Sequence, residues 1–251
     1  MKPSVTVVVA AHKPYRMPDD PVYLPLQVGA AGKPSFGFAR DDDGENISGR
    51  NANWCELTGL YWAWKHLPGD ALGLVHYRRH FKGPAGGIAT GAELVASLEE
   101  ADVILPRKRR YFIETSYSHY AHAHHARDLD LTREILAARH PGQAAAFDRV
   151  MKRRSGHRFN MLVMRRPAFE AYCAWLFDLL FELERRLDVS TYSANDARVF
   201  GFVAERLLDV WLEGAGLRVR ELGVLHLESQ RWVRKAVLFI ARKLGLTRRP
   251  S

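Results

Sequence analysis

Cysteine is scarce in this chain, and no hydrophobic stretch is long. The 251 residues include two cysteines, Cys55 and Cys173, each inside an apolar helical pattern. We expect reduced thiols in a cytoplasmic protein rather than a disulfide framework. The apolar run at residues 5–11 is too short for a signal-peptide core with its cleavage site, and far too short to span a bilayer. We therefore expect a protein that is made and kept in the cytoplasm.

Several catalytic signatures are also missing. The sequence contains no phosphate-binding loop of the Gly-x-x-x-x-Gly-Lys type, no Gly-x-Gly-x-x-Gly and no Gly-x-Ser-x-Gly. Nucleotide kinases, simple dehydrogenases and hydrolases with a nucleophile elbow therefore lack their usual support. Hydrophobic residues make up 47% and charged residues 26%, a balance that excludes a wholly disordered or collagen-like chain.

Acidic residues are absent from the end of the chain. Overall, 37 Lys and Arg face 28 Asp and Glu, a formal net charge of +9. After Glu228 the sequence has no acid and seven basic residues: Arg231, Arg234, Lys235, Arg242, Lys243, Arg248 and Arg249. The preceding 228 residues are thus nearly neutral, which argues against a nucleic-acid groove along the body of the protein.

The basic segment alternates with apolar residues at helical spacing. Trp232, Val233, Val237, Ile240 and Leu244 recur at helical intervals, with Lys and Arg beside or opposite them. This composition predicts an interfacial helix on an anionic membrane surface across residues 230–249. The alternative is a terminal helix that packs on the core and exposes a basic face. We divide the chain into a domain at residues 1–228 and a basic amphipathic tail at 229–251.

Hydrophobic periodicity predicts strands that alternate with helices. Strands are expected at residues 5–11, 71–75, 102–106, 159–164 and 217–226. Helices are expected at 53–67, 92–100, 129–139, 143–153, 167–187 and 195–213, the first with Glu56 in a capping box. This order predicts a single α/β domain, with a mostly parallel central sheet flanked by helices.

Polar side chains cluster at the ends of the expected strands, where sheets of this kind bind ligands. His12 and Lys13 follow the strand expected at 5–11, and His76, Tyr77, Arg78 and Arg79 follow the strand expected at 71–75. His157 and Arg158 precede the strand expected at 159–164. Lys13, Arg78 and Arg79 on one rim would bind a diphosphate, because guanidinium groups bind phosphate oxygens bidentately. The alternative is that they are solvated loop residues paired with acids, and for His80 we expect a structural role.

Histidines and carboxylates elsewhere carry weaker signals. His119, His122, His124 and His125 lack the spacing and cysteine partners of a zinc site, so His119 or His122 is expected to contact sugar hydroxyls or phosphate, or else to lie at a solvated helix start. Asp196 stands at a helix start, where it is a candidate general base or a favourable helix-terminal charge. We interpret Glu205 as buried structure and residues 41–43 as a solvated acidic loop.

Six motifs resemble a known bacterial family. They are ISGRN (47–51), CELTGLYWAWK (55–65), GLVHYRR (73–79), SHY (118–120), HRFNM (157–161) and RVFGFVAER (198–206). Together they resemble the family catalogued as domain of unknown function 4422, over roughly residues 5–226. That family is similar to glycosyltransferases of the GT-A type, whose members occur among capsule, exopolysaccharide and O-antigen synthesis proteins.

The resemblance implies a UDP-linked sugar donor and a lipid-linked saccharide acceptor at the inner membrane face. Some relatives are associated with galactofuranose transfer, which suggests galactofuranose as the sugar. The resemblance places His12 and Lys13 near the nucleotide, and Asn51, His157 and Asn160 among the substrate-binding residues. Many GT-A enzymes carry a metal-binding Asp-x-Asp where this chain has residues 76–79, which include no carboxylate. We therefore expect no metal cofactor, with Arg78 and Arg79 on the diphosphate, although a carboxylate from another loop could still bring in Mg or Mn. The alternative function is a non-catalytic, membrane-recruited scaffold of a polysaccharide assembly complex.

Overall fold

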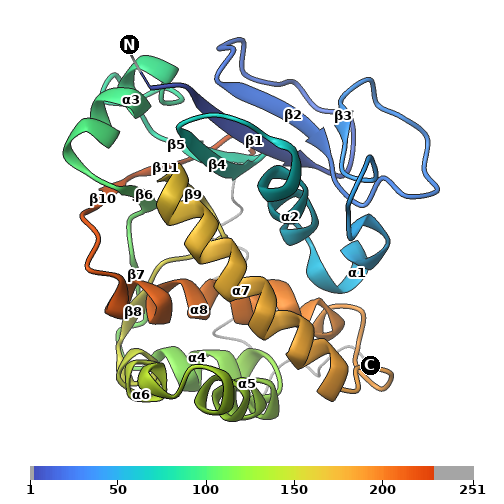
Figure 1. The fold of residues 1–251 in the computed structure, drawn as a ribbon, viewed down its shortest axis with the longest axis vertical. Coiled ribbons are helices and arrows are strands. Elements are labelled where there is room, and N and C mark those ends of the chain that lie inside the picture. The colour runs from blue at the N-terminus through green and yellow to red at the C-terminus, as the bar shows by residue number, and fades with distance from the viewer. Residues whose placement is uncertain (1–2, 229–251) are drawn as a thin grey trace, which may run out of the picture.

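A mostly parallel β-sheet forms the centre of the protein, and helices cover it (Figure 1). The computed structural model describes residues 3–228. The main path of the sheet has the order β10-β6-β9-β4-β1-β2-β3, with β5 and β11 added at one end of β4. The strands are β1 (Val5–Ala11), β2 (Tyr23–Gln27), β3 (Ala39–Arg40), β4 (Ala71–His76), β5 (Arg79–Phe81), β6 (Val103–Pro106), β7 (Arg109–Arg110), β8 (Ser155–Gly156), β9 (Leu162–Arg165), β10 (Val219–Leu222) and β11 (Val224–His226).

The centre of the sheet is buried on both faces. Strand β1 pairs in parallel with β2 and with β4, and its Val7, Val8 and Val9 have no exposed surface. Strand β9 runs antiparallel between β4 and β6. It approaches β4 so closely that a Cβ atom at Gly73 would lie 2.7 Å from the Leu162 carbonyl oxygen. The expected α/β fold with a mostly parallel sheet is confirmed.

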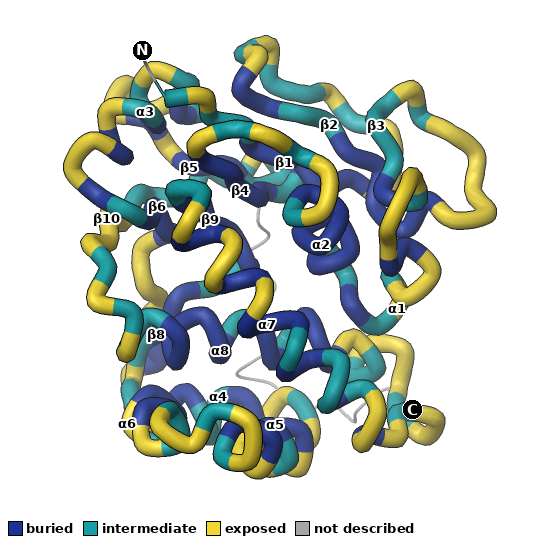
Figure 2. Tube along the Cα trace, in the orientation of Figure 1, coloured by how far each residue is buried: buried dark blue, intermediate teal, exposed yellow. Residues whose placement is uncertain are grey.

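Helices form one layer on each face of the sheet and a further group below it (Figures 1 and 2). Helix α3 packs on one face, while α2 and α7 pack on the other and α8 packs behind α7. The helices are α1 (Asn51–Trp54), α2 (Leu57–His66), α3 (Gly91–Glu100), α4 (Ser116–Ala123), α5 (Ala126–Arg139), α6 (Ala144–Lys152), α7 (Arg166–Arg186) and α8 (Val199–Ala215), with a 3-10 turn at Asp196–Arg198 before α8.

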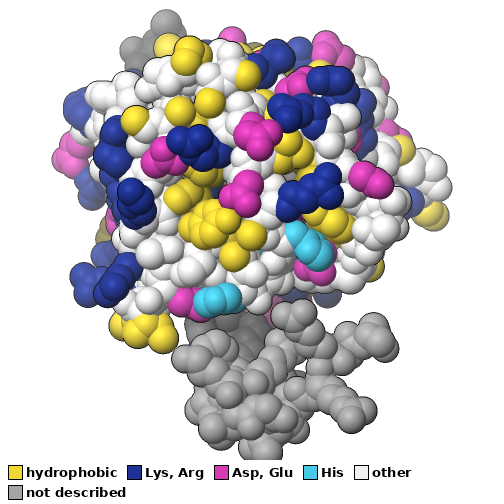
Figure 3. All heavy atoms as spheres, turned by 90° about the horizontal axis from the view of Figure 1, so that it is seen from below, with side chains coloured by type: hydrophobic (Ala, Val, Ile, Leu, Met, Phe, Trp, Pro, Cys, Tyr) yellow, Lys and Arg dark blue, Asp and Glu magenta, His cyan; other side chains and the backbone are white. Residues whose placement is uncertain are grey.

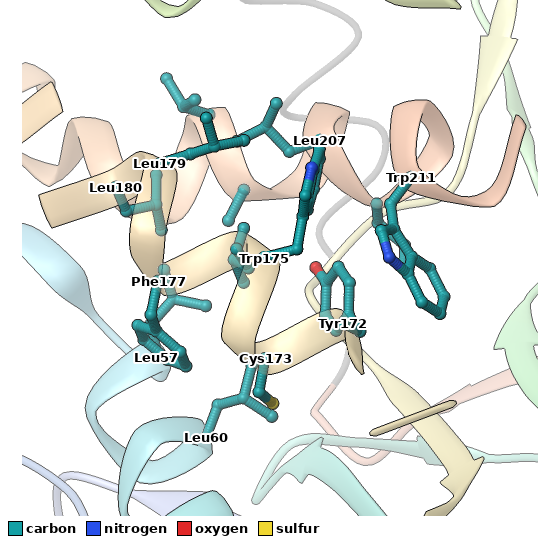
Figure 4. Close-up of a cluster of buried hydrophobic side chains, with 14 of the residues drawn as sticks. Leu57, Leu60, Tyr172, Cys173, Trp175, Phe177, Leu179, Leu180, Leu207 and Trp211 are labelled. Atoms are coloured by element: carbon teal, nitrogen blue, oxygen red, sulfur yellow. The ribbon is translucent and has the colours of Figure 1, made fainter. Parts of the chain in front are cut away.

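The largest part of the core lies around α7. Figure 4 shows side chains of α7, among them Tyr172 and Phe177, between Leu57 and Leu60 of α2 and Leu207 of α8. Burying such side chains contributes roughly 1.5–3 kcal/mol each relative to leaving them exposed. This packing fixes α8, and hence the side chains that α8 carries towards the sheet.

Two local predictions are wrong in ways that matter for the site. The helix expected at 53–67 is broken at Cys55, whose φ of 53° is left-handed, so Glu56 caps nothing with its side chain. Asp41, expected in a solvated loop, is fully buried and accepts hydrogen bonds from the Gly29 and Ala30 amides. Strands β2 and β3 form at residues 23–27 and 39–40, where the sequence predicts no strand, and they extend the sheet beyond β1.

The tail predictions lie outside the described residues. Residues 229–251, including the predicted membrane helix at 230–249, are not described, so the division into a domain at 1–228 and a tail stays a prediction. Within residues 3–228, none of the helices is long and apolar enough to cross a membrane.

Burial of His80 predicts a loss of stability in acid. His80 has no exposed surface and packs edge-on against the Tyr23 ring, 5.5 Å between centroids. Desolvation lowers its pKa from 6.5 to about 4, so between these values the unfolded chain binds a proton that the native chain does not. The free energy of unfolding should therefore fall as the pH drops from about 6.5 to about 4, by up to about 3 kcal/mol from this residue.

Urea unfolding at several pH values checks this expectation. The variant His80→Leu, which has a similar volume and no titrating group, should show a shallower dependence on pH in the same range. An equally steep dependence in the variant would contradict the assignment to His80.

Candidate functional site

A cleft of about 520 Å³ opens at the carboxyl ends of β1 and β4. Helices α1 and α8, the residues Cys55 and Glu56 between α1 and α2, and the segment before β9 form its other walls. The side chains that line it include His12, Asn51, Cys55, Glu56, His76, Tyr77, Arg78, Arg79, Arg158, Phe159, Arg198, Phe202 and Glu205. Six of the predicted substrate-binding residues are brought together here: His12, Asn51, His76, Tyr77, Arg78 and Arg79.

The cleft carries an excess of positive charge. Four arginines line it, against the two carboxylates Glu56 and Glu205. The Arg79 guanidinium lies 4.5 Å from the centre of the Phe159 ring, and burial together with Arg78 lowers the pKa of its side chain. A partly desolvated cation beside another cation favours an anionic ligand, which would restore the lost solvation and offset the repulsion.

The β1 end of the cleft combines aromatic rings with cations. The His12 ring meets Tyr77 edge-on at 5.2 Å, and Lys13 Nζ lies 5.4 Å from the centre of the Tyr77 ring. Burial, then Arg78 and Lys13, lower the pKa of His12, so at neutral pH its imidazole is uncharged. Lys13 and Arg78 both contact the Glu228 carboxylate, at 3.6 and 3.3 Å.

Glu56 reaches the cleft because the backbone turns at Cys55. Its Oε1 accepts a hydrogen bond from Asn160 Nδ2 at 2.7 Å and lies 3.6 Å from His76 Nε2. Since a carbonyl oxygen only accepts, His76 Nε2 carries the proton that it donates to the Phe159 carbonyl at 2.7 Å. The Asn160 side-chain amide thus orients the Glu56 carboxylate. The second oxygen, Oε2, accepts no hydrogen bond from any residue in 3–228.

The Glu205 carboxylate makes more contacts than that of Glu56. Its Oε1 accepts from the Phe159 amide at 3.0 Å, and its Oε2 contacts Arg206 Nη1 at 3.0 Å and Arg158 Nε at 3.2 Å. These contacts occupy both carboxylate oxygens, so Glu205 positions the arginines. Arg158 Nη1 is buried and has no hydrogen-bond partner within residues 3–228, which leaves a donor for a ligand in the cleft.

The remaining predicted residues lie outside the lining of the cleft. His157 is buried between the Asp209 and Glu221 carboxylates, at 2.6 and 3.2 Å. Asn160 holds Glu56 and the Gly201 carbonyl. These two residues stabilise the segment that carries Arg158 and Phe159, so their relation to the cleft is indirect.

The α4 histidines are separate from the cleft. His119 packs against Tyr111 in a tilted arrangement, 4.5 Å between ring centroids, and burial together with Arg158 and Arg206 lowers its pKa to about 4. His122 is largely exposed and contacts Glu114 at 2.7 Å. Neither lines the cleft. Lys13 also lies outside the lining, against the Tyr77 ring and the Glu228 carboxylate.

Asp196 also lies outside the lining. Its carboxylate accepts from Ser193 Oγ at 2.8 Å and contacts His124 Nδ1 at 3.2 Å. The His124 ring in turn stacks on Phe202, 4.1 Å between centroids. Asp196 therefore supports a wall of the cleft through two intervening rings.

The sequence patterns did not indicate that Cys55, Glu56 and Arg198 line the cleft. They indicated a purely structural role for Glu205. All four lie within the motifs at 55–65 and 198–206. Membership of these motifs could therefore have indicated a place in the site. Helical periodicity instead assigned Glu56 to a helix cap and Glu205 to a buried helix face.

The carboxylates of the cleft do not fit a divalent cation. Within residues 3–228 there is no group of three His, Cys, Asp or Glu side chains arranged to hold a metal ion. Both Glu205 oxygens are engaged, one by the Phe159 amide and the other by Arg158 and Arg206, and one Glu56 oxygen accepts the Asn160 amide.

Comparison with known proteins agrees with this architecture. The family model described as Domain of unknown function (DUF4422) matches residues 6–216. Among solved structures, the apo form of WbbM, a bifunctional glycosyltransferase, is similar to this chain with a TM-score of 0.81 and 30% sequence identity. The match covers 90% of this chain but 46% of the WbbM chain, so this chain spans about half the length of that relative. No functionally curated protein matches. The motifs, the sheet and the matched residues together show that the chain belongs to the DUF4422 family.

Proposed function

We propose that this protein is a glycosyltransferase that moves a sugar from a nucleoside diphosphate donor, UDP-linked, to a hydroxyl group of a saccharide. The observation that carries the proposal is the excess of arginine in a cleft at the carboxyl ends of β1 and β4. The diphosphate of a nucleotide sugar bears two negative charges. Four arginines and two carboxylates line the cleft, so its net positive charge matches the charge of the diphosphate. The likeness to a bifunctional glycosyltransferase supports the same reaction class.

The reaction is a single displacement at the anomeric carbon. The acceptor oxygen forms a bond to this carbon while the bond to the diphosphate oxygen breaks, and the electron pair of that bond leaves with UDP. The acceptor hydroxyl gives its proton to a carboxylate. Charge grows on the leaving diphosphate, so fixed cations aimed at it stabilise the transition state more than the ground state.

The arginines take the role that a divalent cation has in many transferases of this type. We propose that Arg79 and the unpartnered Nη1 of Arg158 bind the diphosphate, with Arg78 and Lys13 at the β1 end. Neutral His12 and Tyr77 then contact the nucleoside. This assignment keeps the hypothesis of metal-independent donor cleavage and adds Arg158 to the residues that bind the diphosphate.

We place the general base at Glu56 rather than at Asp196. Asp196 is separated from the cleft by His124 and Phe202, whereas Glu56 lines the cleft and has an oxygen not engaged by the described donors. General acid–base catalysis requires the base within hydrogen-bond reach of the acceptor hydroxyl. We further propose that the acceptor is a lipid-linked saccharide of cell-surface polysaccharide synthesis, that galactofuranose is the sugar, and that the protein resides at the inner membrane face.

Calorimetric titration of UDP tests the proposal directly. Purified protein should bind UDP equally well with Mn and with excess chelator, and uridine, which lacks the phosphates, should bind far more weakly. Binding only with Mn would retain a transferase but overturn the metal-free site. No binding in either condition would favour the non-catalytic scaffold instead.

A further inference from the structure

The turn between β7 and α4 presents two large apolar side chains to solvent. Phe112 is 79% exposed and Ile113 is 74% exposed. The next most exposed large hydrophobic residues in the described chain, Val219 and Leu227, reach 40% and 39%. A contiguous, strongly exposed apolar pair marks an interaction site more often than single exposed residues do.

This turn is held rigidly, so the exposure is built into the fold. The Tyr111 amide donates to the Arg154 carbonyl at 2.8 Å, and the Ser116 amide donates to the Arg153 carbonyl at 2.7 Å. Tyr111 itself is buried against His119. Between these anchors Phe112 adopts a φ of 61°, a left-handed conformation that bulky side chains avoid. The fold thus imposes strain that orients an aromatic side chain outwards.

Cationic side chains flank the apolar tip. Arg107, Lys108, Arg109 and Arg110 are all exposed, and β7 pairs with β8 beside the exposed Arg154. Lys108 contacts Glu221 at 3.8 Å, whereas the four arginines form no ion pair with any described residue. Lys and Arg gather along the left edge of Figure 3, the side on which Figure 1 labels β7 and β8.

We propose that residues 107–113 dock on an anionic lipid surface. Phe112 and Ile113 would enter the boundary between headgroups and acyl chains, while the arginines contact lipid phosphates. An aromatic and an aliphatic side chain next to several basic residues is the composition that binds such interfaces, and each basic residue near the surface adds to the attraction. The proposal rests on residues 107–113 and Arg154 alone.

Docking there would bring the cleft close to the membrane. Strand β8 is followed after His157 by Arg158, which lines the cleft. A lipid-linked acceptor would then be presented to Glu56 without leaving the bilayer. This consequence rests on the proposed function, whereas lipid binding by the turn does not.

Fluorescence at the turn tests the proposal in the full chain. The variant Ile113→Cys carries an environment-sensitive dye, and Val219→Cys carries the same dye as the matched control, both in a background in which Cys55 and Cys173 are serine. With phosphatidylcholine–phosphatidylglycerol vesicles, the dye at position 113 should shift to shorter wavelength and brighten severalfold, while the dye at 219 should not. Pure phosphatidylcholine vesicles should give a much smaller change.

A second measurement keeps the test independent of labelling. Replacing Phe112 and Ile113 with serine should weaken co-sedimentation with the mixed vesicles by about tenfold or more. UDP binding of this variant should be unchanged, which shows that the fold and the cleft are intact. An unchanged dye spectrum at 113 together with unchanged vesicle affinity would overturn the proposal. So would a change in sedimentation coefficient without a loss of lipid binding, since the turn would then be a contact between protein copies.

Discussion

Glu56→Gln is expected to lower the kcat of sugar transfer by about 10²–10⁴-fold, the usual contribution of a general base. The glutamine oxygen can still accept the Asn160 amide, which lies 2.7 Å from Glu56 Oε1. The geometry is therefore retained and only the capacity to take a proton is lost. UDP release from the donor identified by screening gives the rate, and calorimetry should show nearly unchanged UDP affinity.

Two matched variants decide what a loss at Glu56 means. Glu182→Gln, near the carboxyl end of α7, removes a carboxylate that pairs with the exposed Arg185 and should leave the rate unchanged. Asp196→Asn should have a small effect, because its contacts reach the cleft only through His124 and Phe202. A large loss in Asp196→Asn with full activity in Glu56→Gln would return the base to the position expected from the sequence.

Glu205→Gln separates positioning from proton transfer. Glu205 accepts from the Phe159 amide and contacts Arg158 and Arg206. Its neutralisation leaves these guanidinium groups without their partner, so we expect a higher donor KM and a lower melting temperature. A selective loss of kcat in this variant would indicate that Glu205 takes the proton.

Arg79→Ala is expected to lower kcat/KM for the donor by about 10²–10³-fold, the magnitude seen when a donor to developing charge is removed. Arg79 stacks on Phe159 and forms no ion pair with any residue in 3–228, so its removal strands no carboxylate. The loss then reports on the ligand. UDP affinity should fall by about tenfold or more, as for a charge-assisted hydrogen bond.

Arg79→Lys distinguishes charge from geometry. Lysine keeps the positive charge but loses the planar fork, so it should restore affinity partly and rate less. Arg133→Ala, which breaks an exposed pair with Asp148 on α6, provides the control and should change neither quantity. If UDP affinity is unaffected by Arg79→Ala but falls in Arg158→Ala, the diphosphate lies deeper in the cleft than proposed.

Much of the architecture was predictable because it depends on local patterns. The β-branched run at residues 5–11 became the buried strand β1, and the run at 71–75 became β4. Because β1 and β4 are parallel and adjacent, their carboxyl ends meet. His12, His76, Tyr77, Arg78 and Arg79 were therefore brought together as expected.

The carboxylates were not predictable in the same way. Helical spacing assigned Glu56 to a capping box, but the left-handed backbone at Cys55 ends α1 and turns Glu56 towards β4. No periodicity encodes a single residue of that conformation. Glu205 follows the pattern of a buried helix face, yet its neighbours there are Arg158 and the Phe159 amide, which lie 46 or more residues away.

By itself the sequence determined the fold class, the strand ends and the cationic residues at 76–79, since hydrophobic period and strand-end position are properties of short segments. Only the tertiary structure decided which acids meet those cations, that Asp196 stands behind His124 and Phe202, and that Phe112 and Ile113 face outwards. These outcomes depend on contacts between distant segments and on left-handed backbone at Cys55 and Phe112. Such strain persists only where the surrounding packing imposes it.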